Sequence, residues 1–481
     1  MKKLKIPKSE AIFVLLIFFI ILAWAMVQPF DVSPDERMRY TIVQYIVEHW
    51  KLPAGYDPEI RDASWGISYA FNPILAYMIM AVFAKVASFF TDNYLMIVKA
   101  ARLVNVLLGA GTAFVLLRIG RYMFDKWGKW IFASLAMLLP GTVFVFSYVN
   151  NDGLAIFSVA LMILFWVRSM KEGWTMVNCI GLAIAIGVCA LAYYNAYGAI
   201  LASIIYFVIS IILGGDSKGK TWNIPYLMKW GMLIVVIVLV IAGWWFVRSY
   251  LLYDGDFLGM HTSSMYAQKY GIEECKPTNR YYYSRSGNSI LHMLFFVPEG
   301  WRHNWMITVA VSFVGTFGYL TVFMPYWLSK CYLLVFIIGM MGCLMTLRKL
   351  FSLWGRKSIV VKKKMNEDEL VKMSVSTYSR LINKKALFHW CMVVTAVVPL
   401  LLLMYYAYCS DFQAQGRYLM PGLVAIMYFI SKGLEEIIER IERKTGKDLK
   451  KKATILLIIL LAAGMLFTFF MVFLPNYIIY L

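Results

Sequence analysis

The chain is dominated by apolar segments that are each long enough to cross a lipid bilayer. Crossing about 30 Å of hydrocarbon takes about 20 helical residues, and stretches of roughly that length recur from residue 11 to residue 474. Hydrophobic residues make up 61% of the 481 residues and charged residues only 15%, whereas a soluble domain is about half apolar and a quarter charged. The sequence therefore predicts an all-α integral membrane protein and excludes a water-soluble globular protein.

The positive charge of the chain has a membrane interpretation. The formal net charge is +20, and the basic residues lie in the connectors between apolar segments, as expected where lysine and arginine set the orientation of the spans. We therefore expect a lipid bilayer as partner and no nucleic acid. The seven cysteines show no CxxC or CxxH spacing, which indicates neither a zinc site nor a disulfide scaffold.

The amino terminus is predicted to be cytoplasmic. Lysines precede the first apolar run, 11–30, and no small-residue cleavage site closes that run, so we interpret it as a span. The loop that begins at Asp31 is then external. Further apolar segments follow at 72–90, 103–118, 130–148, 153–167, 174–192, 195–213, 230–247, 305–325, 327–347, 388–407, 418–431 and 453–474.

Two of these segments are predicted not to cross. The basic connector 118–129 should be cytoplasmic, so only one of the two segments between Asp31 and Arg118 can span the membrane. We assign 72–90 as an interfacial or re-entrant helix, because it starts at Asn72-Pro73 and carries a lysine. The same alternation of cytoplasmic and external connectors predicts that 305–325 is re-entrant. Glycines and a proline interrupt this segment. About 11 transmembrane helices remain.

The alternation of sides divides the chain into three parts. Residues 1–250 form an amino-terminal membrane module with the first external loop, 251–326 an external loop with the re-entrant segment, and 327–481 a carboxy-terminal membrane module with basic cytoplasmic loops. The carboxyl terminus is expected outside.

The first external loop contains a carboxylate that local structure does not explain. In Ser33-Pro34-Asp35-Glu36, the serine is a predicted helix N-cap, the proline suits the first helical position and Glu36 completes a capping box. Asp35 remains free for chemistry. The capping pattern favours Asp35 over Glu36 as a catalytic base without excluding Glu36.

Other polar residues are predicted on the same side. Asn151 and Asp152 lie in a very short turn between two uncharged spans, where turn formation and function explain them equally well. Lys99 and Arg102 are expected at headgroup height. Three more candidates lie together at the end of a later span: Gln415, Arg417 and Tyr418.

This residue set is typical of sugar transfer from a lipid phosphate. A polyprenyl-phosphate sugar carries its activation in the anomeric phosphoester, so the outer face needs no nucleotide site, and the sequence contains no phosphate-binding loop, GxSxG or HExxH motif. The leaving phosphate needs cations more than a strong acid. One carboxylate can then take the proton of the acceptor hydroxyl in a single displacement, which inverts the anomeric centre.

Two motifs resemble those of a known family. Pro34-Asp35-Glu36, with Arg39-Tyr40 following, resembles the Pro-Asp-Glu-x-x-His-Phe signature of an uncharacterised bacterial membrane-protein family in the GT-C glycosyltransferase superfamily, and 415–421 resembles its late Gln-Gly-Arg-Tyr-x-x-Pro motif. Segments 148–152 and 312–318 are also similar, in the same order, so the resemblance runs over most of the chain.

The resemblance implies a GT-C-like enzyme of the bacterial plasma membrane, in which the first-loop acid is the base and the active site is external. This chain has Arg39 where the family has histidine, which argues against a metal ligand there and for contact with the donor phosphate. Some superfamily members bind a divalent cation such as Mg or Mn between the two acids that correspond to Asp35 and Asp152. We assign no metal ligands in this chain and keep a divalent cation, Mg or Mn, as an open alternative for the cofactor.

We therefore predict a glycosyltransferase that moves a sugar from a polyprenyl-phosphate donor to an envelope glycan or glycolipid acceptor. The predicted catalytic residues are Asp35, Glu36 and Asp152, and the predicted substrate-binding residues are Arg39, Tyr40, Lys99, Arg102, Asn151, Gln415, Arg417 and Tyr418. A transporter or flippase of lipid-linked saccharides is the alternative from another class, and a polymerase that takes a diphosphate-linked donor is a third reading. A flippase predicts charges deep within spans, whereas 130–213 carries them mainly in its connectors.

Overall fold

The computed structural model describes residues 7–215, 220–354, 356–366, 369–378 and 381–478. Over these ranges the chain is mostly helical, which confirms the predicted all-α membrane fold. The described residues contain eight helices, or runs of consecutive helices, that are long and apolar enough to cross a membrane. They are α1 (Lys8–Val27), α4 (Tyr94–Met123), α7 (Asp152–Glu172), η3–α9 (Tyr194–Ile212), α10–η4–α11 (Ile224–Leu252), α15 (Tyr326–Leu344), α17 (Lys384–Cys409) and α19–η8–α20 (Lys450–Tyr477).

The other three expected crossings fall on shorter or amphipathic helices, which are not among these eight. They are the consecutive pair α5 (Gly128–Met137) and α6 (Pro140–Val145), then α8 (Met176–Ala190) and α18 (Leu423–Thr445). Helix α18 packs against α15 and α5. At the α15–α18 contact, a Cβ on Gly433 would clash with the backbone of Gly339, so small residues let the two backbones approach closely.

The two segments expected not to cross form short helices. Helix α3 (Leu75–Ser88) has 14 residues, about 21 Å at 1.5 Å per residue, and α14 (Trp305–Gly315) has 11. Helix α14 is followed by a hairpin of two short strands, β1 (Thr316–Phe317) and β2 (Val322–Phe323), which reverses the chain. Neither helix is among the eight that are long enough to cross; because α8, with 15 residues, is also outside that set, the assignment of 72–90 and 305–325 as non-crossing stays a prediction.

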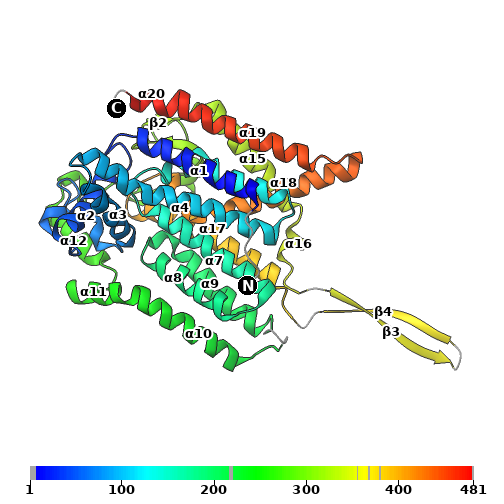
Figure 1. The fold of residues 1–481 in the computed structure, drawn as a ribbon. Helices are drawn as coiled ribbons and strands as arrows, with labels where there is room; N and C mark the ends of the chain where they lie inside the picture. The colour runs from blue at the N-terminus through cyan, green and yellow to red at the C-terminus, as the bar shows by residue number, and fades with distance from the viewer. Residues whose placement is uncertain (1–6, 216–219, 355, 367–368, 379–380, 479–481) are drawn as a thin grey trace.

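The connectors gather the shorter elements at one end of the bundle, here called the site end. Figure 1 shows α2 (Glu36–His49), α3 and α12 (Met260–Tyr270) together at that end. The remaining short elements of these connectors are η1 (Pro58–Ile60), η2 (Tyr69–Phe71), η5 (Glu273–Cys275), η6 (Tyr283–Ser286), α13 (Ile290–Phe295) and η7 (Gly416–Gly422).

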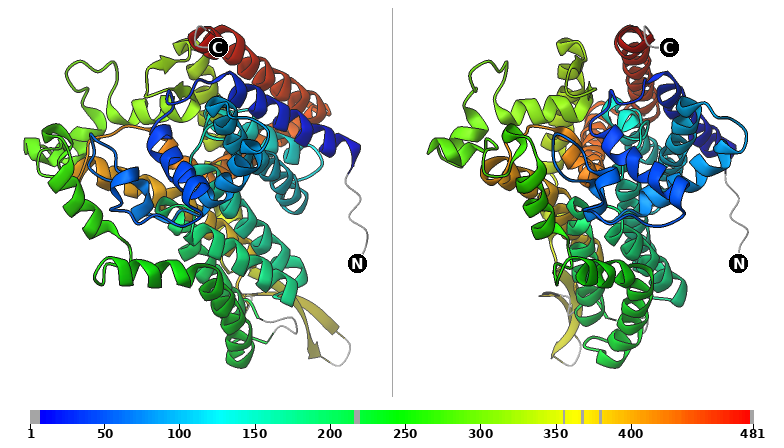
Figure 2. Two further views of the ribbon diagram at one scale, coloured as in Figure 1. Left: turned by 60° about the vertical axis from the view of Figure 1, so that its left-hand side comes forward. Right: turned by 90° about the vertical axis from the view of Figure 1, so that its left-hand side faces the viewer.

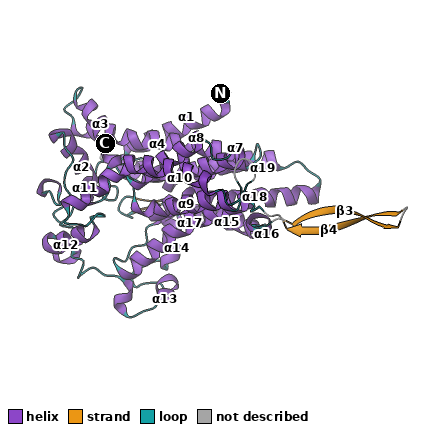
Figure 3. Cartoon of the chain, turned by 90° about the horizontal axis from the view of Figure 1, so that it is seen from below, coloured by secondary structure: helices purple, strands orange, loops and turns teal. Residues whose placement is uncertain are grey.

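The other end, here called the far end, carries an antiparallel hairpin. Strands β3 (Arg356–Asn366) and β4 (Glu369–Tyr378) pair with Arg356 opposite Tyr378 and follow α16 (Leu347–Phe351). Figure 3 shows this hairpin extending away from the helices. It lies in the connector that was predicted to be cytoplasmic from its basic residues.

Ion pairs join the span ends at the far end. Glu10, near the start of α1, is buried and pairs with Arg121 of α4 and with Lys129 of α5, the latter at 2.6 Å. Lys450, at the start of α19, contacts Asp125 at 2.6 Å and Glu435 at 3.1 Å. Because each buried charge has an opposite partner, these contacts fix the ends of the helices relative to one another.

The carboxy-terminal helices lie beside the first helix. Figure 2 shows α19–α20 next to α1 in both views. The rings of Trp24 and Phe473 meet there, with centroids 4.1 Å apart. Since α1 starts at the far end, its last turn delivers the chain to the site end directly before Asp35.

Candidate active site

The backbone around Asp35 differs from the predicted capping box. Helix α2 starts at Glu36, and Asp35 is the N-cap residue, with φ 61° and ψ 17° in the left-handed region and no side-chain capping bond. Aspartate is among the few non-glycine residues that tolerate this conformation. Ser33 instead accepts a hydrogen bond from the side chain of Gln28. The prediction that Ser33 caps the helix and Glu36 closes a capping box is therefore wrong, whereas the Asp35 carboxylate is indeed left free of capping.

The Asp35 carboxylate contacts Arg417, a residue from the last part of the sequence. An Arg417 Nη2 hydrogen bond reaches Asp35 Oδ2 at 2.7 Å, and Nη1 donates to the Pro34 carbonyl oxygen at 3.4 Å. Arg417 lies in η7, which is held close to α14: a Cβ on Gly416 would clash with the Phe313 backbone. The structure thus brings together the first-loop acid and the arginine of the late motif.

Electrostatics keep Asp35 ionised. Burial alone would raise the pKa of Asp35, but the positive charges of Arg417 and Arg39, with hydrogen bonds from Arg417 and Tyr69, lower that pKa below its ordinary value. The side chain keeps 22% of its surface exposed. The group is therefore a carboxylate at neutral pH, and its basicity depends on where Arg417 lies.

Arg39 lies between the two predicted acids. Its Nη2 is 3.6 Å from Asp35 Oδ2, its Nη1 is 3.4 Å from Asp152 Oδ2, and the guanidinium covers the ring of Tyr69 at 4.9 Å. A guanidinium has no lone pair to offer a metal and its charge repels a cation. The pair Asp35 and Asp152 therefore does not fit a divalent cation between them.

Several buried polar atoms around this cluster lack a protein partner. Within the described ranges they include Arg39 Nε, Asn151 Oδ1, Asp152 Oδ1, Gln415 Oε1 and Arg417 Nε. Buried polar groups are almost always hydrogen-bonded, so a concentration of unpaired donors and acceptors indicates a place for a polar ligand. Asn151 is itself fixed by a bond from Nδ2 to the Ala192 carbonyl oxygen at 2.8 Å.

Glu36 and Arg102 pair with each other, which corrects two assignments. Arg102 donates Nε and Nη2 to the two Glu36 oxygens at 2.8 Å each, and its remaining donors go to the carbonyl oxygens of Ala25, Gln28 and Pro29. Glu36 also accepts the backbone N–H of Val149 at 3.0 Å. Both side chains are almost wholly buried, so the pair joins three segments and leaves Arg102 no donor for a phosphate.

Two other predicted binding residues are not placed in the cluster. Tyr40 is buried among aromatic rings, edge-on to Phe30 and Tyr94, which makes it a packing residue. Lys99 is half-buried on α4, one helical turn before Arg102. Its side chain makes no hydrogen bond or ion pair in the described part of the chain.

The late motif forms a hydrogen-bonded network that holds Arg417. The Tyr418 hydroxyl accepts from Arg417 at 3.3 Å and donates to Gln413 Oε1 at 2.9 Å. Gln413 also accepts from Gln415 at 3.2 Å and donates to Asp411 at 2.6 Å. The sequence pattern already grouped Gln413 with Gln415, Arg417 and Tyr418 in one polar site, and the structure shows Gln413 hydrogen-bonded within that group.

Tyr69 was not predicted. It belongs to η2, in a stretch without a recognisable motif, and only the tertiary fold carries it to Asp35 and Arg39. The one signal in the sequence is its position in the first external loop.

A narrow pocket opens beside Arg417. Pro34, Gln415 and Arg417 form its polar side, and Phe144, Val145 and Met420 contribute apolar atoms. The volume of this pocket is only about 20 Å³, roughly the space of one water molecule, so it marks a boundary between polar and apolar atoms beside Arg417 and does not hold a larger ligand in this structure.

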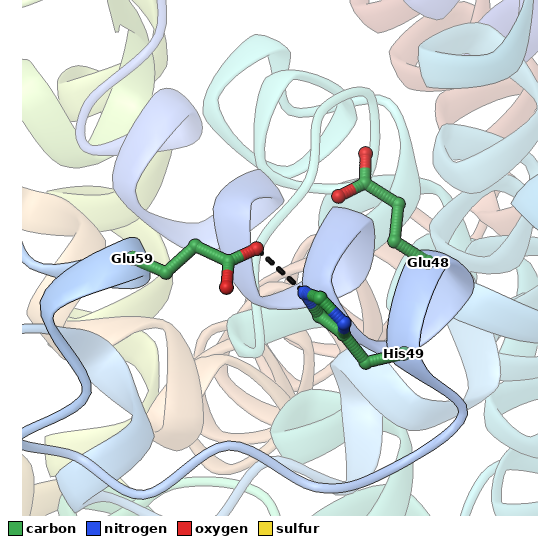
Figure 4. Close-up of side chains that lie close together, drawn as sticks. All are labelled: Glu48, His49 and Glu59. Atoms are coloured by element: carbon green, nitrogen blue, oxygen red, sulfur yellow. Dashed lines mark hydrogen bonds and ion pairs between the residues drawn. The ribbon is translucent and has the colours of Figure 1, made fainter.

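A second cluster satisfies the spacing of a metal site but lies elsewhere. Glu48, His49 and Glu59 are exposed side chains whose potential ligand atoms lie within 4.8 Å of one another, and His49 Nε2 is 2.7 Å from Glu59 Oε1 (Figure 4). His49 is the last residue of α2, and Asp35 is the N-cap at the other end of this helix. The cluster of Glu48, His49 and Glu59 is therefore about 20 Å from Asp35 along the helix axis. It cannot take part in a reaction at Asp35.

Residues 56–427 match the sequence profile of a family described as "Predicted membrane protein (DUF2142)". The chain belongs to the DUF2142 family. The matched range includes Asp152 and Arg417, whereas Asp35 precedes it.

The fold of this DUF2142 chain is similar to those of several solved structures, including an oligosaccharyltransferase. ArnT from Cupriavidus metallidurans, bound to undecaprenyl phosphate, has a TM-score of 0.53 at 11% identity, over 95% of this chain and 74% of that one. The oligosaccharyltransferase AglB from Archaeoglobus fulgidus, with an inhibitory peptide and a dolichol-phosphate, has a TM-score of 0.51 at 11% identity. The match covers 95% of this chain and 55% of the AglB chain. A form of the Archaeoglobus enzyme with Zn and sulfate has a TM-score of 0.50 at 13% identity. The match covers 94% of this chain and 52% of that enzyme's chain.

These likenesses show that the chain shares its fold with ArnT and the Archaeoglobus enzyme, in agreement with the fold expected from the sequence. The DUF2142 chain spans about half the length of the oligosaccharyltransferase chains that it matches. A comparison of its sequence with curated proteins finds no match.

Proposed function

We propose that this protein is a membrane glycosyltransferase that moves a sugar from a polyprenyl-phosphate donor to an envelope glycan or glycolipid. The observation that carries the proposal is the contact between Asp35 and Arg417 at 2.7 Å, surrounded by buried polar atoms without partners. It places a carboxylate that can accept a proton beside a cation that can bind a phosphate, in a fold similar to those of enzymes solved with lipid phosphates.

The donor phosphate is proposed to bind at Arg417. The Nε of this residue is buried without a partner, and its guanidinium borders the pocket with apolar walls. A guanidinium is suited to phosphate oxygens because its donors lie in one plane.

The proposed reaction is a single displacement at the anomeric carbon. The acceptor hydroxyl oxygen forms the new bond to that carbon, the bond from the carbon to the phosphate oxygen breaks, and polyprenyl phosphate leaves with the bonding electron pair. The acceptor proton passes to Asp35. Attack opposite the leaving group inverts the anomeric configuration, and no external acid is required because the phosphate is a stable anion.

The bond between Arg417 and Asp35 also controls the basicity of the Asp35 carboxylate. While Arg417 bonds to Asp35, the pKa of this carboxyl is lowered and its affinity for a proton is poor. A donor phosphate that attracts the Arg417 donors weakens this bond, so the pKa of Asp35 rises as the donor arrives. The carboxylate would then become a stronger base once the donor is bound.

Arg39 and Asp152 are proposed to position the acceptor. Arg39 holds Asp152 at 3.4 Å, and the unpaired Oδ1 atoms of Asp152 and Asn151 are acceptors for sugar hydroxyls. We place this site on the outer face of a bacterial plasma membrane, with the amino terminus in the cytoplasm. The lysines before α1 and the basic connectors at the far end support this orientation.

The function is tested with purified protein in detergent, a labelled polyprenyl-phosphate sugar and envelope glycolipids as acceptors. We expect release of polyprenyl phosphate and a new glycosidic bond of inverted configuration, both lost in Asp35→Asn. Movement of the labelled lipid across a vesicle membrane without bond formation would instead identify a flippase. Activity with only a diphosphate-linked oligosaccharide would identify a polymerase. Either result contradicts the proposed donor chemistry.

A further inference from the structure

A charged cavity lies at the far end of the bundle, away from Asp35. Its volume is about 640 Å³, and it lies between the end of α15, α16 and the carboxy-terminal half of α18. Four of its lining residues are cationic and two are anionic: Arg348, Lys349, Arg440 and Arg443 against Glu436 and Glu439.

Both acids of this cavity already have cationic partners. Glu436 Oε1 is 2.8 Å from Arg440 Nε and 3.2 Å from Arg443 Nη2, and Glu439 is 2.9 Å from Lys450 Nζ. Lys349 interacts electrostatically with Glu436 at longer range, but neither acid of the cavity forms an ion pair with Arg348 or Lys349. Neither side chain makes a hydrogen bond or ion pair with the residues that the structure describes, so the cavity has a surplus of positive charge.

Apolar side chains border the same cavity. Leu344, Met345 and Leu347 contribute to its lining and are exposed, with 59%, 53% and 44% of their surface accessible. Leu344 ends a membrane-spanning helix, so these residues lie where the hydrocarbon of the bilayer gives way to headgroups. Helix α18 adds an amphipathic surface at the same level.

We propose that this cavity binds the headgroup of an anionic phospholipid. Arg348 and Lys349 supply the unpaired cations for the phosphodiester, and Arg440 and Arg443 supply further N–H donors. The acyl chains lie along Leu344, Met345 and Leu347. A soluble phosphate would use the cations but gain nothing from the exposed apolar residues, which is why we assign the site to a lipid.

The proposal is tested by native mass spectrometry of the full chain, delipidated in neutral detergent and titrated with phosphatidylglycerol. We expect wild-type protein to retain one lipid that the double variant Arg348→Gln/Lys349→Gln binds at least about tenfold more weakly. The matched control is Lys444→Gln/Lys447→Gln, which removes two exposed charges near the same end outside the cavity. It should bind like wild type.

Two further ligands show whether the cavity binds an anionic phospholipid or a soluble phosphate. Phosphatidylcholine should bind more weakly than phosphatidylglycerol, because its zwitterionic headgroup has no net negative charge and the cationic side chains of the cavity repel its choline group. Glycerol 3-phosphate, which has no acyl chain, should not compete at concentrations comparable to the lipid. Equal binding of phosphatidylglycerol by the double variant, equal binding of phosphatidylcholine, or full competition by glycerol 3-phosphate would each overturn the assignment. Circular dichroism of the double variant confirms that a loss of binding is not a loss of fold.

Discussion

Arg417 and Asp35 are separated by 382 positions in the sequence and lie 2.7 Å apart in the structure. Their contact joins the loop after the first span to the loop before α18. A carboxylate fixed by one arginine in this way is ionised, accessible to solvent on one side and adjacent to the cation that a phosphate ligand would attract.

Asp35→Asn should abolish transfer and leave the protein folded. Asparagine keeps the size of the side chain and tolerates the left-handed backbone of Asp35, but it cannot accept the acceptor proton. General base catalysis contributes about 10²- to 10⁴-fold, so we expect a loss of that size in kcat. Asp31→Asn is the matched control, because Asp31 has a positive φ in the same loop but pairs with the exposed Arg37. Similar activity losses in both variants would contradict the assignment of Asp35 as base.

Arg417→Lys should raise the KM for the donor while the protein stays folded. Lysine keeps the charge but loses the planar set of donors, and a hydrogen bond to a charged group contributes about 1.5–3 kcal/mol. We expect the KM for the polyprenyl-phosphate donor to rise about 10- to 100-fold. The measurement is initial rate against donor concentration. Arg37→Lys, at an exposed arginine of α2 that pairs with Asp31, should leave the KM unchanged. An unchanged KM in Arg417→Lys would exclude a role of Arg417 at the phosphate.

The pH profile of kcat/KM should reveal the link between Arg417 and Asp35. The lowered pKa of Asp35 keeps the active carboxylate present above that pKa and loses it as pH falls through it, so the acid limb of the wild type should lie below the ordinary value of 3.8. Arg417→Gln removes the strongest lowering influence and leaves burial, which raises the pKa. The limb should therefore move to higher pH in this variant. A limb that stays in place would show that Asp35 does not control the rate.

Much of this fold follows from local sequence properties, whereas part of the site does not. Apolar length and the placement of basic connectors predicted the spans and the short helices at 75–88 and 305–315, because each property belongs to a continuous segment. The capping box failed because a buried Arg102 from α4 pairs with Glu36, and no local pattern reveals that partner. Arg102 was likewise predicted at headgroup height because its neighbours in sequence do not reveal its burial.

Glu36→Gln should destabilise the protein, because it leaves Arg102 buried with an uncompensated charge. Breaking one partner of a buried ion pair costs about 3–5 kcal/mol, so the thermal unfolding midpoint in detergent should fall markedly. The double variant Glu36→Gln/Arg102→Met removes both charges and should recover part of the loss, which a double-mutant cycle measures. If Glu36→Gln instead unfolds like wild type but is inactive, Glu36 rather than Asp35 is the base.

Transfer by the wild-type protein should persist in a chelator, because the guanidinium of Arg39 occupies the position between Asp35 and Asp152 where a divalent cation would have to bind. Arg39→Asn should lower the rate, because the two acids then face each other without a cation. Added Mg or Mn should restore part of that loss in Arg39→Asn and have no effect on the wild type, since only the variant offers both carboxylates to a metal. Rates measured with EDTA and then with excess metal distinguish the cases. A wild-type enzyme that EDTA inactivates and Mn restores would show that the reaction depends on a metal and that Arg39 does not replace it.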